Sequence, residues 1–204
     1  DTEMPWNDPH VAAARFWALR QEEDFQLEVS VAVVSAGNIT LLSFECLTIS
    51  YHRLEYGCSP TFNFGRMPDG WTASSRRSKG IRGTNNQVTR YSSHVGCIFS
   101  GKPNPLSLNW LELDWVSYSA FLPQNSCRGV YIGINWERNQ AVYIGESKQL
   151  RPRIKSHVRD GVKAEWYWLE FEEADDRQRL EIENDLLSSY ISYYGEPPTH
   201  QFNQ

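Results

Sequence analysis

The chain has 204 residues, of which 40% are hydrophobic and 13% aromatic, enough to bury a core in one large or two small domains. No run of about 18 apolar residues, the length that a membrane span needs, occurs in it, because polar residues interrupt even the apolar-leaning stretch Val29 to Phe44. A net charge of −5 argues against a protein coated with positive charge, and we expect no membrane partner.

The charge is distributed unevenly along the chain. Between Arg66 and Lys102 seven basic residues stand against one acid, and between Arg128 and Lys163 eight stand against three. Most of the compensating acids lie between Glu165 and Glu196. Positive surfaces can therefore coexist with a negative total, and two segments are candidates for contact with a polyanion.

The first 122 residues predict a mixed α+β N-terminal lobe. An amphipathic helix is expected from Asp8 to about Gln26, because an Asn-Asp-Pro signal precedes it. Leu27 to Tyr51 is rich in β-branched residues, with two runs separated by a turn at Ala36 to Asn38, and favours a hairpin.

Gly65 to Ser93 lies in the basic stretch of residues 66–102 and is rich in Gly, Ser, Asn and Thr, which predicts a long exposed loop. After Arg66, its basic residues are Arg76, Arg77, Lys79, Arg82 and Arg90. They could follow a DNA backbone, making this lobe a recognition region, or belong to an ordinary solvated loop. Both interpretations stay open.

The four cysteines have spacings that match no zinc motif and are sparse for a disulfide scaffold. They are Cys46, Cys58, Cys97 and Cys127. Four buried thiols in a reducing compartment are the simplest interpretation, so we expect a cytoplasmic, intracellular protein.

A second hairpin follows Arg128, with two β-type segments separated by the polar turn Asn135 to Gln140. Tyr131 and Tyr143 stand one on each strand. Across a tight hairpin two such phenols can point to the same face and converge on one ligand.

The next segment predicts a short helix that ends at Gly161, because its apolar residues repeat every four positions at Leu150, Ile154 and Val158. Arg153 and His157 are also four positions apart and lie on another face of this helix. A guanidinium beside an imidazole suits a phosphate.

Glu165 to Glu173 alternates as a third strand, and a longer helix follows that is capped by Asp175 or Asp176 and stopped by Gly195. Glu183 shares the apolar side of that helix. Such a carboxylate either reaches a wet rim or is held where a cation offsets its desolvation.

In this order the motifs resemble the signature of the GIY-YIG endonuclease family. The matching residues are Gly129, Val130 and Tyr131, then Tyr143, Ile144 and Gly145, then Leu150, Arg153, His157, Glu183 and Asn203. The resemblance covers residues 123–204 and implies a nuclease domain with a small three-stranded antiparallel sheet flanked by helices. It does not extend to the N-terminal lobe.

Three positions depart from the family pattern. Glu146 stands where several members have lysine, and Lys148 is the nearest basic residue. Asn203 lies five residues after Pro198, a wider gap than usual. Glu181 is an alternative to Glu183 as the helical glutamate.

The resemblance implies a metal-dependent enzyme that hydrolyses DNA phosphodiester bonds, with Glu183 as the sole protein ligand of one Mg²⁺ or Mn²⁺ ion per active site. It assigns phosphate clamping to Arg153 and a hydrogen bond to the phosphate to Tyr143. Tyr131 would activate water, provided that nearby cations lower its phenol pKa, and His157 would relay the proton.

Lys148, Arg151 and Asn203 are expected to contact the substrate. We expect a site-specific, restriction-type enzyme, which would act as a homodimer on a symmetric site. The alternatives are a catalytically inactive nucleic-acid-binding module, a non-specific nuclease toxin and a structure-selective repair nuclease.

Overall fold

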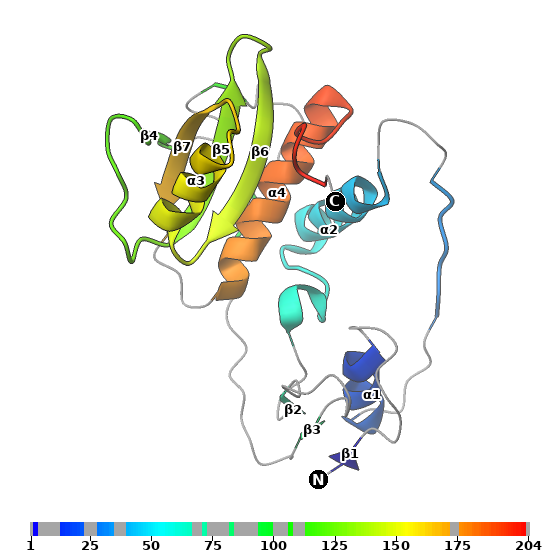
Figure 1. The fold of residues 1–204 in the computed structure, drawn as a ribbon. Coiled ribbons are helices and arrows are strands. Elements are labelled where there is room, and N and C mark those ends of the chain that lie inside the picture. Colours follow the sequence, from blue (N-terminus) through cyan, green and yellow to red (C-terminus); the bar gives the residue numbers. More distant parts are fainter. Residues whose placement is uncertain are drawn as a thin grey trace. The chain divides into compact units, whose positions relative to one another are not determined.

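The chain has an α+β fold with two compact units (Figure 1). The computed structural model describes residues 2–3, 13–22, 28–34, 40–66, 71–72, 82–83, 94–99, 106–107, 113–171 and 176–202. The first unit combines Asp1–Val33 with Pro60–Ser93, and the second combines Val34–Ser59 with His94–Gln204. This division differs from the single boundary expected after residue 122. The assignment of a recognition lobe and a nuclease domain stays a prediction.

The first unit contains the helix α1 (Ala13–Glu22) and a small sheet. Its strands are β1 (Thr2–Glu3), β3 (Arg82–Gly83) and β2 (Trp71–Thr72), in that spatial order and all antiparallel. Arg82 therefore lies in the middle strand and not in a loop, which corrects the expectation for that position. A short 3₁₀ turn (Asn63–Gly65) follows Phe62, whose ring meets that of Phe16 edge-on.

The hairpin expected between residues 27 and 51 is wrong. Residues 28–34 form no strand, and the second run is the start of the helix α2 (Leu41–Tyr56). Thr40 caps this helix, because its hydroxyl accepts a hydrogen bond from the backbone N–H of Ser43 at 3.1 Å. Gly57 ends it in the left-handed conformation, with φ of 72°. The Thr40 and Gly57 caps of α2 thus outweigh the β propensity of the second run.

The second unit is built on an antiparallel sheet of four strands, one more than expected. In spatial order they are β4 (Val116–Ser117), β7 (Glu165–Glu170), β5 (Gly129–Asn135) and β6 (Gln140–Ser147). The tight hairpin β5–β6 is confirmed with the expected turn. Its register shifts between Gly133 and Ile134, where Val142 on β6 is left without a partner.

The two faces of this sheet carry two separate apolar clusters. On one face Val130, Ile132 and Ile144 pack with residues of the helix α4 (Asp176–Tyr194), such as Leu186 and Tyr190. On the other, the strand residues Tyr131 and Trp166 pack with Leu150 and Ile154 of the helix α3 (Leu150–Arg159), which Figure 1 shows lying over the strands. The expected helices α3 and α4 are confirmed, although Val158 is 52% exposed and lies outside the packed stripe.

Helix α2 packs against α4 through polar side chains that are fully buried. Arg53 on α2 donates through Nε and Nη2 to the Asp185 carboxylate and forms an ion pair with Glu181 at 3.0 Å. Its guanidinium also donates to the carbonyl of Val95 at 3.2 Å. These bonds join α2, α4 and residues 94–99 into one polar network.

All four cysteines are free thiols, as expected, but only Cys127 is buried and the other three are partly exposed. In the part of the chain that the structure describes, no helix combines the length and apolar character of a membrane-spanning segment.

Candidate active site

The two phenols of the hairpin lie on one face of the sheet. Tyr131 is opposite Gly145 and Tyr143 is opposite Gly133, so the tyrosines are diagonal neighbours on β5 and β6. Their rings are stacked, with centroids 5.9 Å apart and planes at 16°. A Cβ at Gly145 would lie 2.7 Å from the Tyr131 hydroxyl and 2.7 Å from Tyr143 Cε1. The glycine is what lets both rings occupy this face.

Helix α3 places Arg153 and His157 beside the buried Tyr131. Arg153 Nε donates to the Tyr131 hydroxyl at 3.0 Å, and His157 Nε2 lies 3.1 Å from the same oxygen. The His157 ring also stacks on Trp166 of β7, with centroids 4.9 Å apart. The i, i+4 spacing read from the sequence thus brings both side chains to one hydroxyl.

The carboxylate of Glu183 on α4 lies within electrostatic reach of Tyr131 and Arg153 in this cluster. The side chain is partly buried, and desolvation, followed by the negative charge of Glu146, raises its pKa to about 7. The positive charges of Arg153 and Arg179 act in the opposite direction. Glu183 also contributes to the electrostatic environment of Tyr131. The structure therefore brings four of the predicted catalytic residues into contact, Tyr131, Tyr143, Arg153 and His157, and the fifth, Glu183, lies within electrostatic reach of Tyr131 and Arg153.

The other glutamate considered for this role, Glu181, is turned into the α2–α4 network. Its side chain is fully buried, with Oε1 2.7 Å from His94 Nδ1 and Oε2 accepting from the backbone N–H of Val95 at 3.1 Å. In spite of burial, hydrogen bonds from Ser59 and His94, the charge of Arg53 and the bond from Val95 lower its pKa. Of the two, Glu183 is the glutamate within electrostatic reach of Tyr131.

The expectation of a lowered phenol pKa at Tyr131 is wrong. Burial raises the pKa of this phenol, and the lowering effect of Arg153 is too small to compensate. His157 changes in the opposite sense: burial, followed by the charge of Arg153, lowers its pKa. At neutral pH the pair is therefore a protonated phenol beside a neutral imidazole.

Residues that the sequence did not assign to the site surround Glu183. Glu146, noted only as a departure from the family pattern, forms an ion pair with the buried Arg179 of α4. A backbone hydrogen bond of Glu146 lowers the Glu183 pKa while its side-chain charge raises it. Cys46 of α2 is also within electrostatic reach of Glu183. In the sequence, the i, i+4 spacing of Arg179 and Glu183 was the signal that could have placed Arg179 beside Glu183.

The donor chemistry around Glu183 fits a hard divalent cation. Mg²⁺ is held in many proteins by one or two carboxylates, with water at its other positions. Glu183 supplies such a carboxylate, and a bound cation would offset the desolvation that raises its pKa. Within the described residues no group of three or more His, Cys, Asp and Glu side chains is placed to hold a metal.

The predicted substrate-binding residues lie partly in this unit. Lys148 is exposed just beyond β6. Arg151, in the first turn of α3, lines a depression of about 460 Å³ together with Asn125, Gln149, Pro152 and Lys155. Arg82 is in β3 of the first unit, whereas Arg76, Arg77, Lys79, Arg90 and Asn203 lie outside the described residues.

Comparison of the chain with protein-family models, with curated proteins and with solved structures found no match.

Proposed function

We propose that the protein is a metal-dependent endonuclease that hydrolyses phosphodiester bonds of DNA by the chemistry of the GIY-YIG family. The observation that carries the proposal is the Tyr131 hydroxyl, which contacts both Arg153 and His157 while the Glu183 carboxylate lies within electrostatic reach. Phosphodiester hydrolysis needs a proton acceptor, a cation against the phosphoryl oxygens and stabilisation of the leaving oxygen. This cluster can meet those needs.

Arg153 is the phosphate clamp. Its guanidinium is held by Tyr131 and Tyr143 while the side chain as a whole is exposed, so phosphate oxygens can reach it. Tyr143 is partly exposed beside His157, at 4.7 Å between ring centroids, and donates a hydrogen bond to the same phosphate.

The Tyr131–His157 pair takes the proton of the attacking water. Because the raised pKa of Tyr131 keeps the phenol protonated, Tyr131 does not act as a free phenolate. Its oxygen accepts the incoming proton as its own proton moves to His157 Nε2, which the lowered pKa of that ring keeps unprotonated. This relay replaces the phenolate base expected from the sequence.

Glu183 would hold one Mg²⁺ or Mn²⁺ ion. When bound, such an ion stabilises the negative charge of the phosphoryl and leaving oxygens.

The deciding experiment incubates supercoiled plasmid with the full-length protein in Mg²⁺ and then in EDTA. Glu183→Ala is compared with Glu137→Ala, because Glu137 is an exposed glutamate in the β5–β6 turn. We expect cleavage by the wild type and by Glu137→Ala, and none with EDTA or with Glu183→Ala. Discrete bands would support a restriction-type enzyme, whereas a smear would favour a non-specific or structure-selective nuclease.

One observation favours a second candidate, a binding module without catalysis. The negative charge of Glu146 raises the pKa of Glu183 and so opposes the ionised carboxylate that a cation needs. A mobility shift with intact plasmid in Mg²⁺ would establish this alternative. On symmetric sites a cleaving enzyme is proposed to act as a homodimer.

A further inference from the structure

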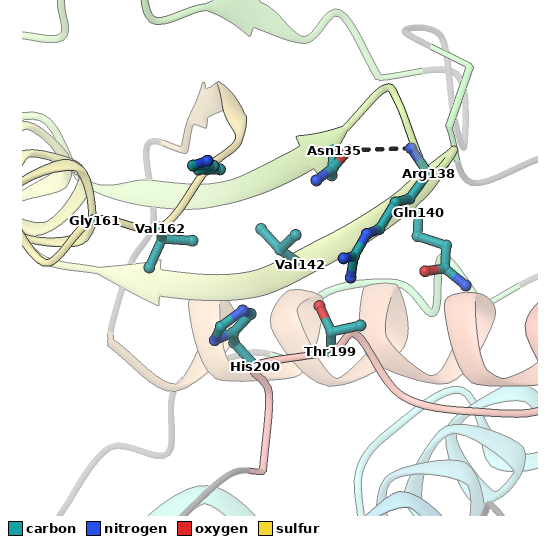
Figure 2. A pocket seen from close by; sticks show the side chains of 9 residues that line it. Asn135, Arg138, Gln140, Val142, Gly161, Val162, Thr199 and His200 are labelled. Atoms are coloured by element: carbon teal, nitrogen blue, oxygen red, sulfur yellow. Dashed lines mark hydrogen bonds between the residues drawn. The ribbon is translucent and has the colours of Figure 1, made fainter.

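A second basic pocket lies at one end of the sheet, beside the candidate active site (Figure 2). It has a volume of about 280 Å³ and is formed by the β5–β6 turn, the loop after α3 and the segment after α4. Its lining residues are Asn135, Arg138, Gln140, Val142, Gly161, Val162, Lys163, Thr199 and His200.

The irregularity of β6 builds this pocket. Val142, the residue without a partner on β5, is buried and lines it. The carbonyl of Val142 accepts from the backbone N–H of His200 at 2.8 Å, which fixes the segment after α4 against the strand. On the other side the backbone N–H of Arg138 donates to Asn135 Oδ1 at 3.1 Å and closes the turn. Backbone bonds therefore hold the pocket walls in place.

The lining is positive. Arg138, Lys163 and His200 contribute to it, and none of the described lining residues is acidic. In Figure 2 the side chains of Arg138 and His200 extend toward the space beside Val142. Neither Arg138 nor Lys163 forms a salt bridge to any residue in the described part of the chain. Two cations and an imidazole around a small pocket are suited to a phosphate group.

The pocket adjoins the cluster of Tyr131 but is not part of it. Tyr143 follows Val142 directly on β6, and the backbone N–H of Val162 donates to the carbonyl of His157 at 3.1 Å. The charge of His200 contributes to the lowered pKa of His157, so the two sites are close. None of the five residues of the active-site cluster lines the pocket.

We propose that the pocket formed by Arg138, Lys163 and His200 binds a backbone phosphate of the nucleic acid next to the one held by the active site. The inference rests on the proposed function and adds a second contact to the same strand. Backbone phosphates bound in this way position the substrate without reading its sequence, so this contact serves affinity and register.

The test measures binding of a fluorescent DNA duplex in EDTA, which prevents cleavage, over a series of salt concentrations. The full-length wild type is compared with the double variant Arg138→Ala, Lys163→Ala. Arg159→Ala is the matched control, because Arg159 is 77% exposed on the last turn of α3 and does not line the pocket. Inorganic phosphate is added as a competitor to separate a backbone phosphate from a free anion.

We expect the double variant to bind the duplex about tenfold more weakly near 0.1 M salt and to lower the slope of log K against log salt by about 1, the effect of one lost phosphate contact. Arg159→Ala should match the wild type. In cleavage assays the double variant should raise KM and leave kcat unchanged.

Equal affinity and slope for the wild type and the double variant would overturn the inference, even if the wild type cleaves plasmid. Displacement of the duplex by phosphate at micromolar concentration would also overturn it and indicate a free-anion site. The double variant could lose affinity as expected while neither the wild type nor any variant cleaves DNA. The proposed phosphate pocket would then be supported and the proposed enzymatic function would fail. If the wild type does not bind the duplex, both the phosphate pocket and the proposed nuclease function are overturned.

Discussion

A single hydroxyl organises the candidate active site. Arg153 Nε can only donate, so the Tyr131 oxygen accepts that bond and its own hydrogen is directed to His157 Nε2. The raised pKa of the phenol and the lowered pKa of the imidazole are the two conditions under which this arrangement persists at neutral pH. The hydroxyl thus fixes the orientation of both α3 side chains.

Tyr131→Phe is expected to slow cleavage by about 10² to 10⁴, the usual range for loss of an acid–base group. It should cost only about 1 kcal/mol of stability, because Arg153 and His157 are not fully buried and water can replace the lost bonds. Single-turnover cleavage and urea unfolding measure the two effects. Tyr193→Phe, at a position 46% exposed, is the control, and an equally active Tyr131→Phe would contradict the proposed relay.

Gly145→Ala is expected to disrupt the same cluster from the backbone side. The new Cβ would meet the Tyr131 hydroxyl at 2.7 Å, and the fully buried Tyr131 ring has no free space to move into. Overpacking of this kind costs about 1–3 kcal/mol. We expect that loss in urea unfolding together with a large loss of cleavage. Gly96→Ala, where a Cβ meets nothing within 4 Å, should change neither, and an unaltered Gly145→Ala would show that the rings are not tightly packed.

The binding of Mg²⁺ is expected to depend on pH through Glu183. Burial raises the pKa of this carboxyl to about 7, whereas in the unfolded chain it ionises near 4.3. Without a cation, the Glu183 carboxyl contributes its full stabilisation of the fold below about pH 4.3, the unfolded pKa. That contribution is lost as the pH rises through the folded pKa of about 7. Since the cation needs the ionised form, Mg²⁺ should raise the melting temperature more at pH 8 than at pH 6. Equal shifts at both pH values, or a shift retained in Glu183→Gln, would contradict this site.

Local signals decided which elements could be predicted from the sequence. The β5–β6 turn, the four-residue repeat of α3 and the stop at Gly195 are all short-range patterns, and each is confirmed. The sequence does not predict helix α2, because the β-branched Ile39 and Thr40 directly precede its first turn, although the Thr40 cap and Gly57 are visible signals. The α2–α4 network could not be predicted, since it joins residues more than a hundred positions apart.

That network ties α2 to the helix that carries Glu183, and its removal has a predictable cost. Arg53→Met leaves Asp185 and Glu181 buried without their cation, a loss of about 3–5 kcal/mol. Arg159→Ala breaks an exposed pair with Asp160 and an exposed hydrogen bond to Ser156, and should change stability by less than about 1 kcal/mol. Urea unfolding of both variants is the measurement. Similar values for the two would mean that the buried contacts contribute no more than a surface pair.

In the molecule as a whole, the second unit is assembled from two separated stretches of chain, residues 34–59 and 94–204. The family-like motifs all lie after residue 122, yet the polar face of α4 is completed by Arg53 and by residues 94–99. The short-range motifs therefore locate the residues of the candidate site but not the helix α2 and residues 94–99 that pack against α4.

A fragment of residues 123–204 is consequently expected not to fold cooperatively. It lacks Cys46, Val95 and Ile98, which pack against the core on α4, and so exposes apolar surface of a small core that supplies only about 3–5 kcal/mol of stability. Circular dichroism during heating should show a broad, shallow transition. A longer fragment of residues 34–204, which keeps α2 and residues 94–99, should show a sharper one. A cooperative transition in the shorter fragment would instead place a folding boundary near residue 122 and make α2 dispensable for the candidate site.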